Sequence, residues 1–262
     1  MKNLKLLLAG LMVVSFAACG SSGGDHDGAT IKEEVGTNIT IIKSKDIAKQ
    51  DESKKTILNS GDQQYVPVSG SNKIGIKNGS HTNLNLDVSG NNNIGMSVDN
   101  NGQEIKNNGG ATINFSGDNG VAMKASNHST ATNIGTINFS GEGIAMLADG
   151  SGSKITNNGG GKITLSGENS VGMFAINGAQ AINNGDIYIT GHNNIGMLAS
   201  GKGSEIKNTG TIHLRGTGSK INPGYDKTGD HELGRDKHGN VGMVARDHGR
   251  IINNGHIVFD QK

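Results

Sequence analysis

Carboxylates and imidazoles, the side chains that most often bind metals or move protons, crowd into one stretch near the end of the chain. They belong to Asp226, Asp230, His231, Glu232, Asp236 and His238. Three cations, Lys227, Arg235 and Lys237, are interleaved with them, and the spacing matches no recognised ligand pattern. We therefore expect no metal and no other cofactor in this stretch.

Motifs of known catalytic chemistry do not occur elsewhere in the sequence. It contains no HExxH zinc motif, Walker phosphate loop or CxxC pair. Its Gly-rich segments recur at intervals rather than forming one phosphate-binding loop after a strand. The formal net charge of +1 also removes the basic field that nucleic-acid binding needs. We expect a protein that is not an enzyme and that binds no nucleic acid.

The single cysteine, Cys19, directly follows a leader of the secretory type. Two lysines precede an apolar run over 6–16, which is shorter than the roughly 20 residues that span a membrane. The tetrapeptide FAAC that ends at Cys19 resembles the lipobox of bacterial lipoproteins. That resemblance implies that Cys19 carries an acyl chain such as palmitate, and that Gly20 after it directs the protein to the outer membrane. The alternative is ordinary signal-peptide cleavage after Ala17.

From residue 69 onward the chain repeats itself, in a composition with 43 Gly, no Trp and only 3% aromatic residues. Aligning the repeats places six methionines in one column: Met96, Met123, Met146, Met173, Met197 and Met243. Their spacings of 27, 23, 27, 24 and 46 residues indicate a unit of about 25 residues with one larger insertion. A shorter first unit places Ile76 in the same column. A thin core can form if these few apolar positions are reused in every unit.

Each unit contains three short strand-like pieces separated by Gly and Asn, which tolerate the positive φ of sharp corners. In the first piece, alternation such as Ile94, Met96 and Val98 predicts one buried face. The glycines Gly95, Gly172, Gly196 and Gly242 are expected on the other face. The second piece ends in a column of asparagines, expected to form an amide ladder: Asn107, Asn133, Asn157, Asn183, Asn208 and Asn253.

Such a repeat predicts an all-β parallel β-helix, or β-solenoid, of about six to seven coils with about 25 residues each. The repeated Gly-Asn-Met block, followed by an apolar-x-Asn step and Gly-x-Ile-x-Phe/Leu, resembles the β-helical passenger region of bacterial autotransporter surface proteins, especially adhesin-like passengers. The resemblance covers residues 69–259 and implies a fold rather than one activity. Autotransporters end in a membrane β-barrel. Here either the lipid at Cys19 replaces that anchor, or the chain is a truncated or split passenger.

The chain is accordingly expected to have three parts. Residues 1–18 form a lipoprotein-type signal peptide, and residues 19–68 a Gly/Ser tether and polar stalk, with a β-like run from Asn38 to Ile42 as a candidate capping strand. Residues 69–262 form the β-helix, with a loop inserted at about 217–237. Insertions in solenoids project from one face, which makes this loop either a binding loop or a tolerated surface loop. Its binding candidates are Tyr225, His231, Arg235 and His238.

The function expected from these features is adhesion or surface binding by an exported lipoprotein on the outer membrane, facing the cell surface. Its partners would be the membrane, through the lipid anchor, and a host glycan, matrix or other cell-surface ligand. Self-association through the ends of the β-helix is expected at the last strand, around Ile257 to Phe259. The alternatives are a structural or secretion module from a split passenger, and a β-helix carbohydrate-active enzyme. Outward positions such as Asn114, Thr164 and Tyr188 show no recurring charged cluster that would favour the enzyme.

Overall fold

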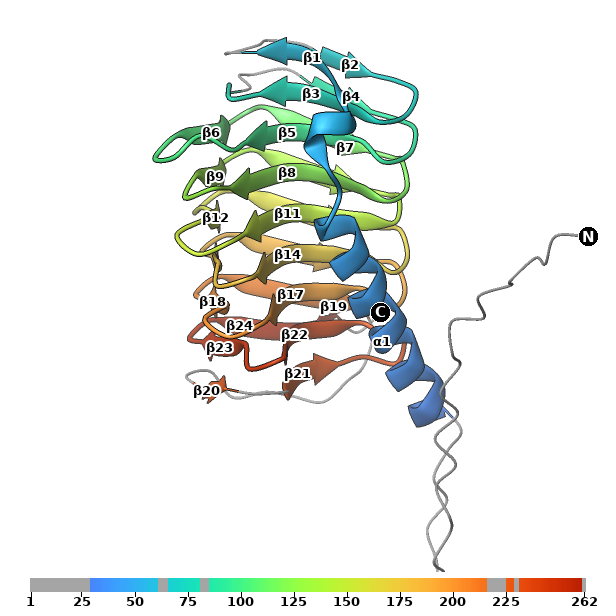
Figure 1. Cartoon of the computed structure of the whole chain (residues 1–262). Coiled ribbons are helices and arrows are strands. Elements are labelled where there is room, and N and C mark those ends of the chain that lie inside the picture. The colour runs from blue at the N-terminus through green and yellow to red at the C-terminus, as the bar shows by residue number, and fades with distance from the viewer. Residues whose placement is uncertain (1–28, 61–65, 81–84, 216–224, 229–230, 261–262) are drawn as a thin grey trace, which may run out of the picture.

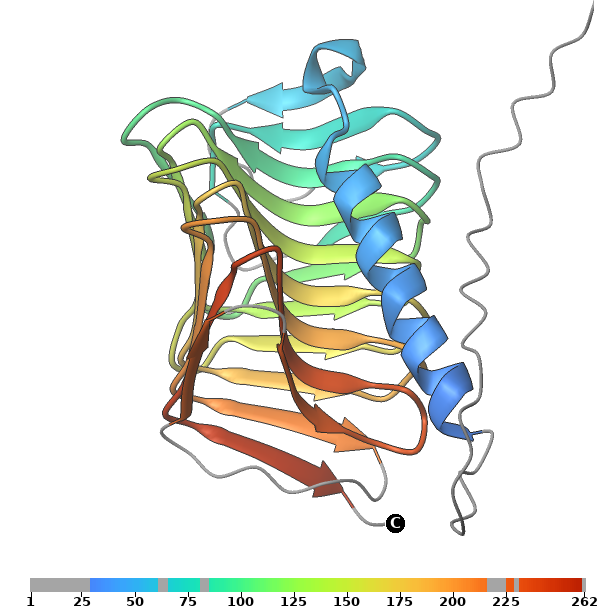
Figure 2. The ribbon, with the colours of Figure 1, turned by 60° about the horizontal axis from the view of Figure 1, so that its bottom comes forward.

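Three β-sheets and one long helix make up the part of the chain that the computed structural model describes, residues 29–60, 66–80, 85–215, 225–228 and 231–260. The sheets wind around a common interior as a β-solenoid, and the helix lies along its side (Figures 1 and 2). The coils β5–β7, β8–β10, β11–β13, β14–β16, β17–β19 and β22–β24 each contribute one strand to every sheet. The predicted all-β parallel β-helix is confirmed.

Each sheet collects the strands of one side of the solenoid, in the following spatial order. Sheet A contains β1 (Thr56–Ser60), β3 (Lys73–Lys77), β5 (Ile94–Val98), β8 (Gly120–Ser126), β11 (Gly143–Asp149), β14 (Val171–Ile176), β17 (Ile195–Ser200), β22 (Val241–Arg246) and β21 (His231–Arg235). Sheet B contains β20 (Tyr225–Thr228), β23 (Arg250–Asn253), β18 (Glu205–Asn208), β15 (Gln180–Asn183), β12 (Lys154–Asn157), β9 (Thr130–Asn133) and β6 (Glu104–Asn107). Sheet C contains β2 (Val66–Val68), β4 (Asn85–Val88), β7 (Thr112–Phe115), β10 (Thr136–Phe139), β13 (Lys162–Leu165), β16 (Asp186–Ile189), β19 (Thr211–Arg215) and β24 (His256–Asp260).

The interior is built from columns of like side chains, because each strand pairs residue for residue with the strand one coil away. The six methionines of sheet A, from Met96 to Met243, pair in register and are fully buried. Ile76 occupies the same position one coil earlier. In sheet C the rings of Phe115 and Phe139 stack with their centroids 4.7 Å apart. These columns bury the apolar surface that a single coil could not bury alone.

The glycine column of sheet A faces inward, and its expected outward position is wrong. A methyl group on Gly172 would lie 3.4 Å from Ile187 Cγ2, and one on Gly196 would lie 3.0 Å from Ile212 Cγ2, both core side chains. Similar approaches occur at Gly95 and Gly242. The glycine and the methionine that follows it both face inward, although they are successive residues. The residue before each glycine therefore lies on the outer side of sheet A and not in the methionine core. Glycine leaves room for the sheet C side chains opposite.

Buried polar ladders run along the corners. From sheet B to sheet C, each asparagine amide donates to the carbonyl oxygen of the next, over 2.7 to 3.0 Å, from Asn107 to Asn253. Because this chain of bonds runs in one direction, Asn107 Oδ1 and Asn253 Nδ2 have no hydrogen-bond partner among the described residues. At the corner from sheet C to sheet A, the backbone N–H of Ser170 donates to Asn194 Oδ1 at 2.8 Å. The backbone N–H of Asn194 donates in the same way to Asn240 Oδ1 at 2.9 Å. The sequence predicts the first ladder and not the second.

A 20-residue helix, α1 (Ala29–Ala48), includes the run from Asn38 to Ile42, so the capping strand expected there is wrong. The β-branched run favours a strand locally. However, Thr37, Ile41, Ser44 and Ala48 recur every three or four residues and are buried on one helical face, so packing against sheet A overrides local propensity. No helix within the described ranges has the combined length and apolar character of a membrane span.

Sheet A therefore has a second apolar cluster on its outer side, in contact with α1. Ile41, Ile47 and Ala48 of α1 belong to this cluster. Its sheet members are Ile74, Ile94, Val121, Ile144, Leu147, Val171, Phe174, Ile176, Ile195, Leu198, Val241 and Val244. The helix crosses the strands from the last coils toward the first (Figure 1). Thr40 donates to the carbonyl of Asn193 at 2.6 Å.

Beyond α1, a short helix, η1 (Glu52–Lys54), fixes the chain to the polar part of the same sheet face. Glu52 accepts a hydrogen bond from Ser97 at 2.8 Å and forms ion pairs with Lys124 at 2.9 Å and Lys77 at 3.4 Å. Burial alone would raise the pKa of Glu52. The charge and hydrogen bond of Lys124, the hydrogen bond from Ser97 and the charge of Lys77 outweigh burial and hold the pKa below its ordinary value.

The sequence predicts that the segment 217–237 projects from the solenoid as a loop. Its described residues instead form two strands that close one end of the solenoid, so that expectation is wrong for them. β20 pairs antiparallel with β23, and β21 pairs antiparallel with β22. Both strands occupy positions where a further coil would add to sheets B and A. Asp236 is buried and accepts hydrogen bonds from the amides of His238 at 2.8 Å and Asn240 at 3.0 Å, which fixes the turn after β21.

Replacing one asparagine of the buried ladder tests its contribution to stability. In Asn157→Ala, the Asn133 amide and the Asn183 oxygen each lose a buried partner. We expect the free energy of unfolding to fall by about 3 kcal/mol, because unsatisfied buried polar groups are costly. Asn138→Ala is the matched control, since Asn138 makes a similar amide bond to Asn114 on the exposed face of sheet C. It should change stability by about 0.5 kcal/mol or less. Urea unfolding would contradict the ladder's importance if both variants behaved alike.

The Glu52 network makes the docking of η1 and α1 dependent on pH. A carboxylate with a lowered pKa stabilises the fold above the pKa it has in the unfolded chain, and that stability is lost as the pH falls through the folded value. We expect the wild type to lose stability below about pH 4 more steeply than Glu52→Gln, which cannot titrate at this position. Thermal unfolding of both proteins between neutral and acidic pH measures the difference. Parallel curves would show that Glu52 does not anchor this segment.

Candidate functional site

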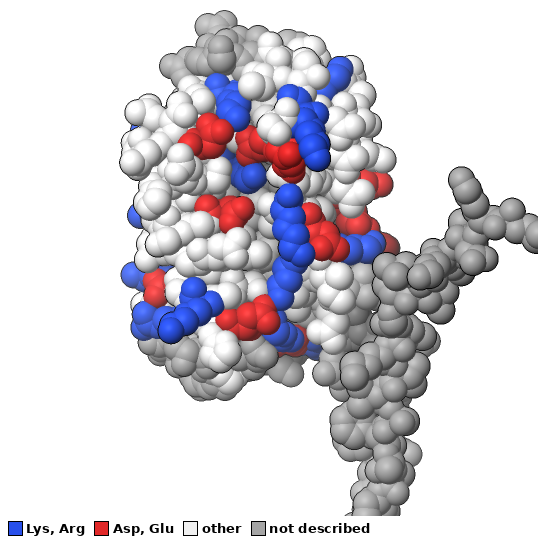
Figure 3. Space-filling view, in the orientation of Figure 1, with Lys and Arg blue, Asp and Glu red and all other residues white. Residues whose placement is uncertain are grey.

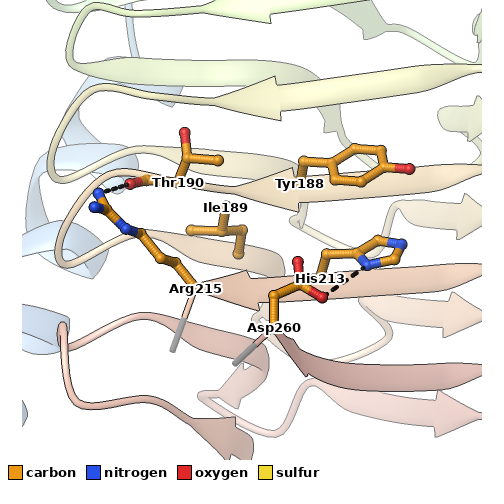
Figure 4. A pocket seen from close by; sticks show the side chains of 6 residues that line it. All are labelled: Tyr188, Ile189, Thr190, His213, Arg215 and Asp260. Carbon is orange, nitrogen blue, oxygen red and sulfur yellow. Dashed lines mark hydrogen bonds and ion pairs between the residues drawn. The ribbon is translucent and has the colours of Figure 1, made fainter. Parts of the chain in front are cut away.

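A hollow of about 330 Å³ lies at one end of sheet C, where the carboxyl ends of β16, β19 and β24 are neighbours. Its volume is within the range of small-molecule sites. Six residues line it: Tyr188, Ile189, Thr190, His213, Arg215 and Asp260. Ile189 belongs to the core, whereas the polar side chains stand on the outer face of the sheet (Figure 4). Tyr188 and His213 share one outward strand position, and Arg215 and Asp260 share the next.

Two stacked rings form one wall of the hollow. Tyr188 and His213 are in register on neighbouring strands, and their rings are parallel within 6° with centroids 4.4 Å apart. Lys162, from β13, places its ammonium 4.5 Å from the centroid of the Tyr188 ring. The phenol is flanked by acids: burial raises the pKa of Tyr188, and the negative charges of Asp186 and Asp260 raise it further. The phenol therefore stays protonated and able to donate a hydrogen bond.

Charged groups of both signs complete the lining, with Asp260 beside the His213 ring and Arg215 directed toward Thr190. Asp260 Oδ1 lies 3.6 Å from His213 Nδ1, and the guanidinium of Arg215 donates to the carbonyl of Thr190 at 3.1 Å (Figure 4). Arg215 and Asp260 are in register on β19 and β24. The hollow thus offers a guanidinium donor, a carboxylate acceptor and a phenol beside an aromatic surface. This combination suits hydrogen bonding to a ligand rich in hydroxyl groups.

The residues predicted for a binding loop do not form one site. Tyr225 is on β20 in sheet B, whereas His231 and Arg235 are on β21 in sheet A. Arg235 forms an ion pair with Glu232 at 2.6 Å, and the ring of His238 meets that of His192 edge to face at 5.1 Å. Within the described ranges, no group of three His, Cys, Asp or Glu is placed to hold a metal ion. Cys19, predicted to be acylated, lies outside the described residues.

The sequence does not single out the hollow, because its residues occur once each and form no cluster that recurs from coil to coil. Aligning the third strands shows the outward column changing from Asn114 and Asn138 through Thr164 to Tyr188 and His213. The change from amides to rings in one column is the signal that the sequence contains.

The face that carries α1 has two other hollows, of about 540 Å³ and 350 Å³, which are lined mainly by charged and amide side chains and by no aromatic ring. Lys and Arg side chains alternate there with Asp and Glu, without an extended area of one sign (Figure 3). Several of these charges are paired, including Lys43 with Glu142 at 2.6 Å and Lys45 with Asp247 at 2.5 Å. They hold α1 against the coils. The hollow on sheet C is therefore the strongest candidate binding site in the described part of the chain.

Comparison with known proteins gives one match. A family model described as the BigA third pectate lyase-like domain matches residues 13–184 and 168–229, which together are more than half of the chain. The match agrees with the β-helical repeat. No curated protein and no solved structure matches the chain.

Proposed function

The chain belongs to the family of the BigA third pectate lyase-like domain, and from that premise we propose that it is a non-enzymatic binding protein of the bacterial cell surface. In this proposal it is exported, anchored to the outer membrane by an acyl chain on Cys19, and resembles an adhesin-like passenger in its repeats. It binds a glycan through the hollow on sheet C. The hollow beside Tyr188 and His213 is the observation that carries the proposal.

The chemistry of the hollow supports a glycan as the ligand. Sugar hydroxyls both donate and accept hydrogen bonds, and Arg215 and Asp260 offer the two complementary partners in register. The apolar edges of the Tyr188 and His213 rings supply a surface for sugar C–H groups. The hollow is open on the side of a sheet, which leaves room for a chain of sugars to extend along the neighbouring coils. Asn138 and Thr164 lie along that path in the same outward column.

Binding without cleavage is the form of the proposal that these side chains favour. Polysaccharide cleavage by two carboxylates requires both to reach the scissile bond from defined distances. Of the residues that line the hollow, Asp260 is the one carboxylate, and it lies 3.6 Å from the His213 imidazole. A single acid beside an imidazole and a guanidinium is suited to holding hydroxyl groups.

A lipid anchor at Cys19 would orient the solenoid on the membrane. Only nine residues lie between Cys19 and Ala29, where α1 begins, and the ten residue-to-residue steps reach at most about 35 Å. α1 begins beside the last coils and ends beside the first (Figures 1 and 2). The anchored protein would therefore hold its last coils near the membrane and β1 farthest from it.

Removing the side chains of the hollow tests the proposed binding. We expect Tyr188→Ala combined with Arg215→Ala to weaken glycan binding about tenfold or more, because both lose central contacts. The measurement is binding of the purified chain to a panel of immobilised host and bacterial glycans. Lys207→Ala, at an outward position of β18 in sheet B, is the control and should bind as the wild type does.

Two results would contradict this function. The first is a wild-type chain that binds none of the glycans, or a double variant that binds them as well as the wild type. The second is the appearance of new sugar-chain ends when the wild type is incubated with a polysaccharide, because this would make the protein an enzyme. Thermal unfolding of each variant separates lost binding from lost folding.

Replacing the cysteine tests the anchor separately. We expect Cys19→Ala to abolish incorporation of labelled palmitate and to release the protein from the membrane fraction. Protease treatment of intact cells should degrade the wild type if it faces outward, with permeabilised cells as the control. A wild type that incorporates no label would contradict the anchor, and a wild type protected until permeabilisation would contradict the surface location.

A further inference from the structure

The two ends of the solenoid differ in how their sheet edges are protected. At the end formed by the last coils, β21 covers sheet A in antiparallel orientation. Glu232 on β21 forms ion pairs with Arg235 at 2.6 Å and Arg246 at 2.7 Å. Charged residues on an edge strand discourage pairing with another chain. At the opposite end, the outermost strand of sheet A is β1, which pairs only with β3 among the described strands.

β1 lacks the usual protection of an edge strand. Its five residues, Thr56–Ser60, include no charge and no proline. Ile57 is 48% exposed and Leu58 is 36% exposed, although both are large apolar residues on a strand. One side of the strand bonds to β3, so the backbone groups of its other side point away from the sheet. An uncharged, apolar edge of this kind is a template for another strand.

We propose that β1 pairs with β1 of a second copy of this chain, in antiparallel orientation across a two-fold axis. The pairing would place Leu58 opposite Leu58, Ile57 opposite Asn59 and Thr56 opposite Ser60, so that sheet A continues from one copy into the other. A second copy is the occupant because the strand is self-complementary in this register. At the other end, β21 presents the charged pairs of Glu232 on the edge of sheet A, and the edge strand of sheet C, β24, contains Asp260, so both edges carry the charge that β1 lacks.

This arrangement closes on itself. A two-fold contact uses the same strand on both copies, so it produces a dimer rather than a fibre. It also moves the site of self-association from the last strand, where the sequence suggested it, to the first. With five residues in each strand, the interface is smaller than a standard specific contact, and we expect a weak dimer that forms at high protein concentration.

The consequence for cells rests on the lipid anchor of the proposed function. With the last coils near the membrane, the two anchors of a dimer would lie at its opposite ends, so that a dimer bridges two surfaces. The pairing itself does not depend on the anchor. The two ideas can therefore fail separately.

The test uses the exported chain with Cys19→Ser, so that no acyl chain can mediate association. Light scattering after size exclusion should show a concentration-dependent increase from the mass of one chain to twice that mass. Adding Leu58→Lys should leave the monomer at every concentration. The controls are Val258→Lys on sheet C and Ile42→Lys on α1, whose apolar side chains are 38% and 60% exposed. Both controls should still dimerise.

A second variant keeps the test decisive if Leu58→Lys disturbs β1 itself. Leu58→Cys in the same background should form a disulfide-linked dimer on mild oxidation, because antiparallel partners bring their Cβ atoms about 5 Å apart. Val258→Cys should not. A wild type that stays monomeric, or a dimer that survives Leu58→Lys and is lost in Ile42→Lys, would overturn the proposal. On cells, we expect the wild type to cause aggregation and Leu58→Lys to abolish it. If the wild type dimerises in solution but cells do not aggregate, the bridging of surfaces is refuted and the dimer is not.

Discussion

Residue-for-residue pairing between successive coils is the constraint on which the rest of this structure depends. Because every strand lies directly beside its counterpart, a side chain that is buried in one coil must be accommodated by the same position in the next. Apolar columns such as that of Met146 then form a core one side chain deep. Polar corners are tolerated only as continuous ladders, because each buried amide, such as Asn157, needs the neighbouring coil as its partner.

The same constraint makes departures from a column informative. On the outer side of sheet A, the column that continues Ser97 and Lys124 becomes apolar at Leu147 and Phe174, and this is where the face passes from the η1 network to α1. On the outer side of sheet C, the column becomes aromatic at Tyr188, where the hollow lies. Each change marks a place where the surface meets something other than water. One partner is a segment of the chain itself, and the other is the proposed ligand.

The repeated features could be predicted from the sequence because repetition supplies its own alignment. The parallel coils follow from that alignment, and so does the pairing of Met173 with Met146 and of Asn183 with Asn157. α1 could not be predicted in this way, since its β-branched run from Asn38 to Ile42 favours a strand and its partner face is assembled from separate coils between Ile74 and Val244. Its buried positions, spaced like Thr37, Ile41 and Ser44, were the available signal. The end strand β21 and the hollow involve residues that occur once, so no repeat identifies them.

Hydrogen exchange on the full chain, read peptide by peptide, would test most directly whether the coils and α1 form one cooperative structure. We expect amides of α1 to exchange as slowly as those of β11 and β14, because the helix is stabilised by the apolar face of sheet A and not by its own sequence. Rapid exchange over residues 29–48, with the central strands still protected, would contradict this and return the segment to a stalk that merely precedes the solenoid.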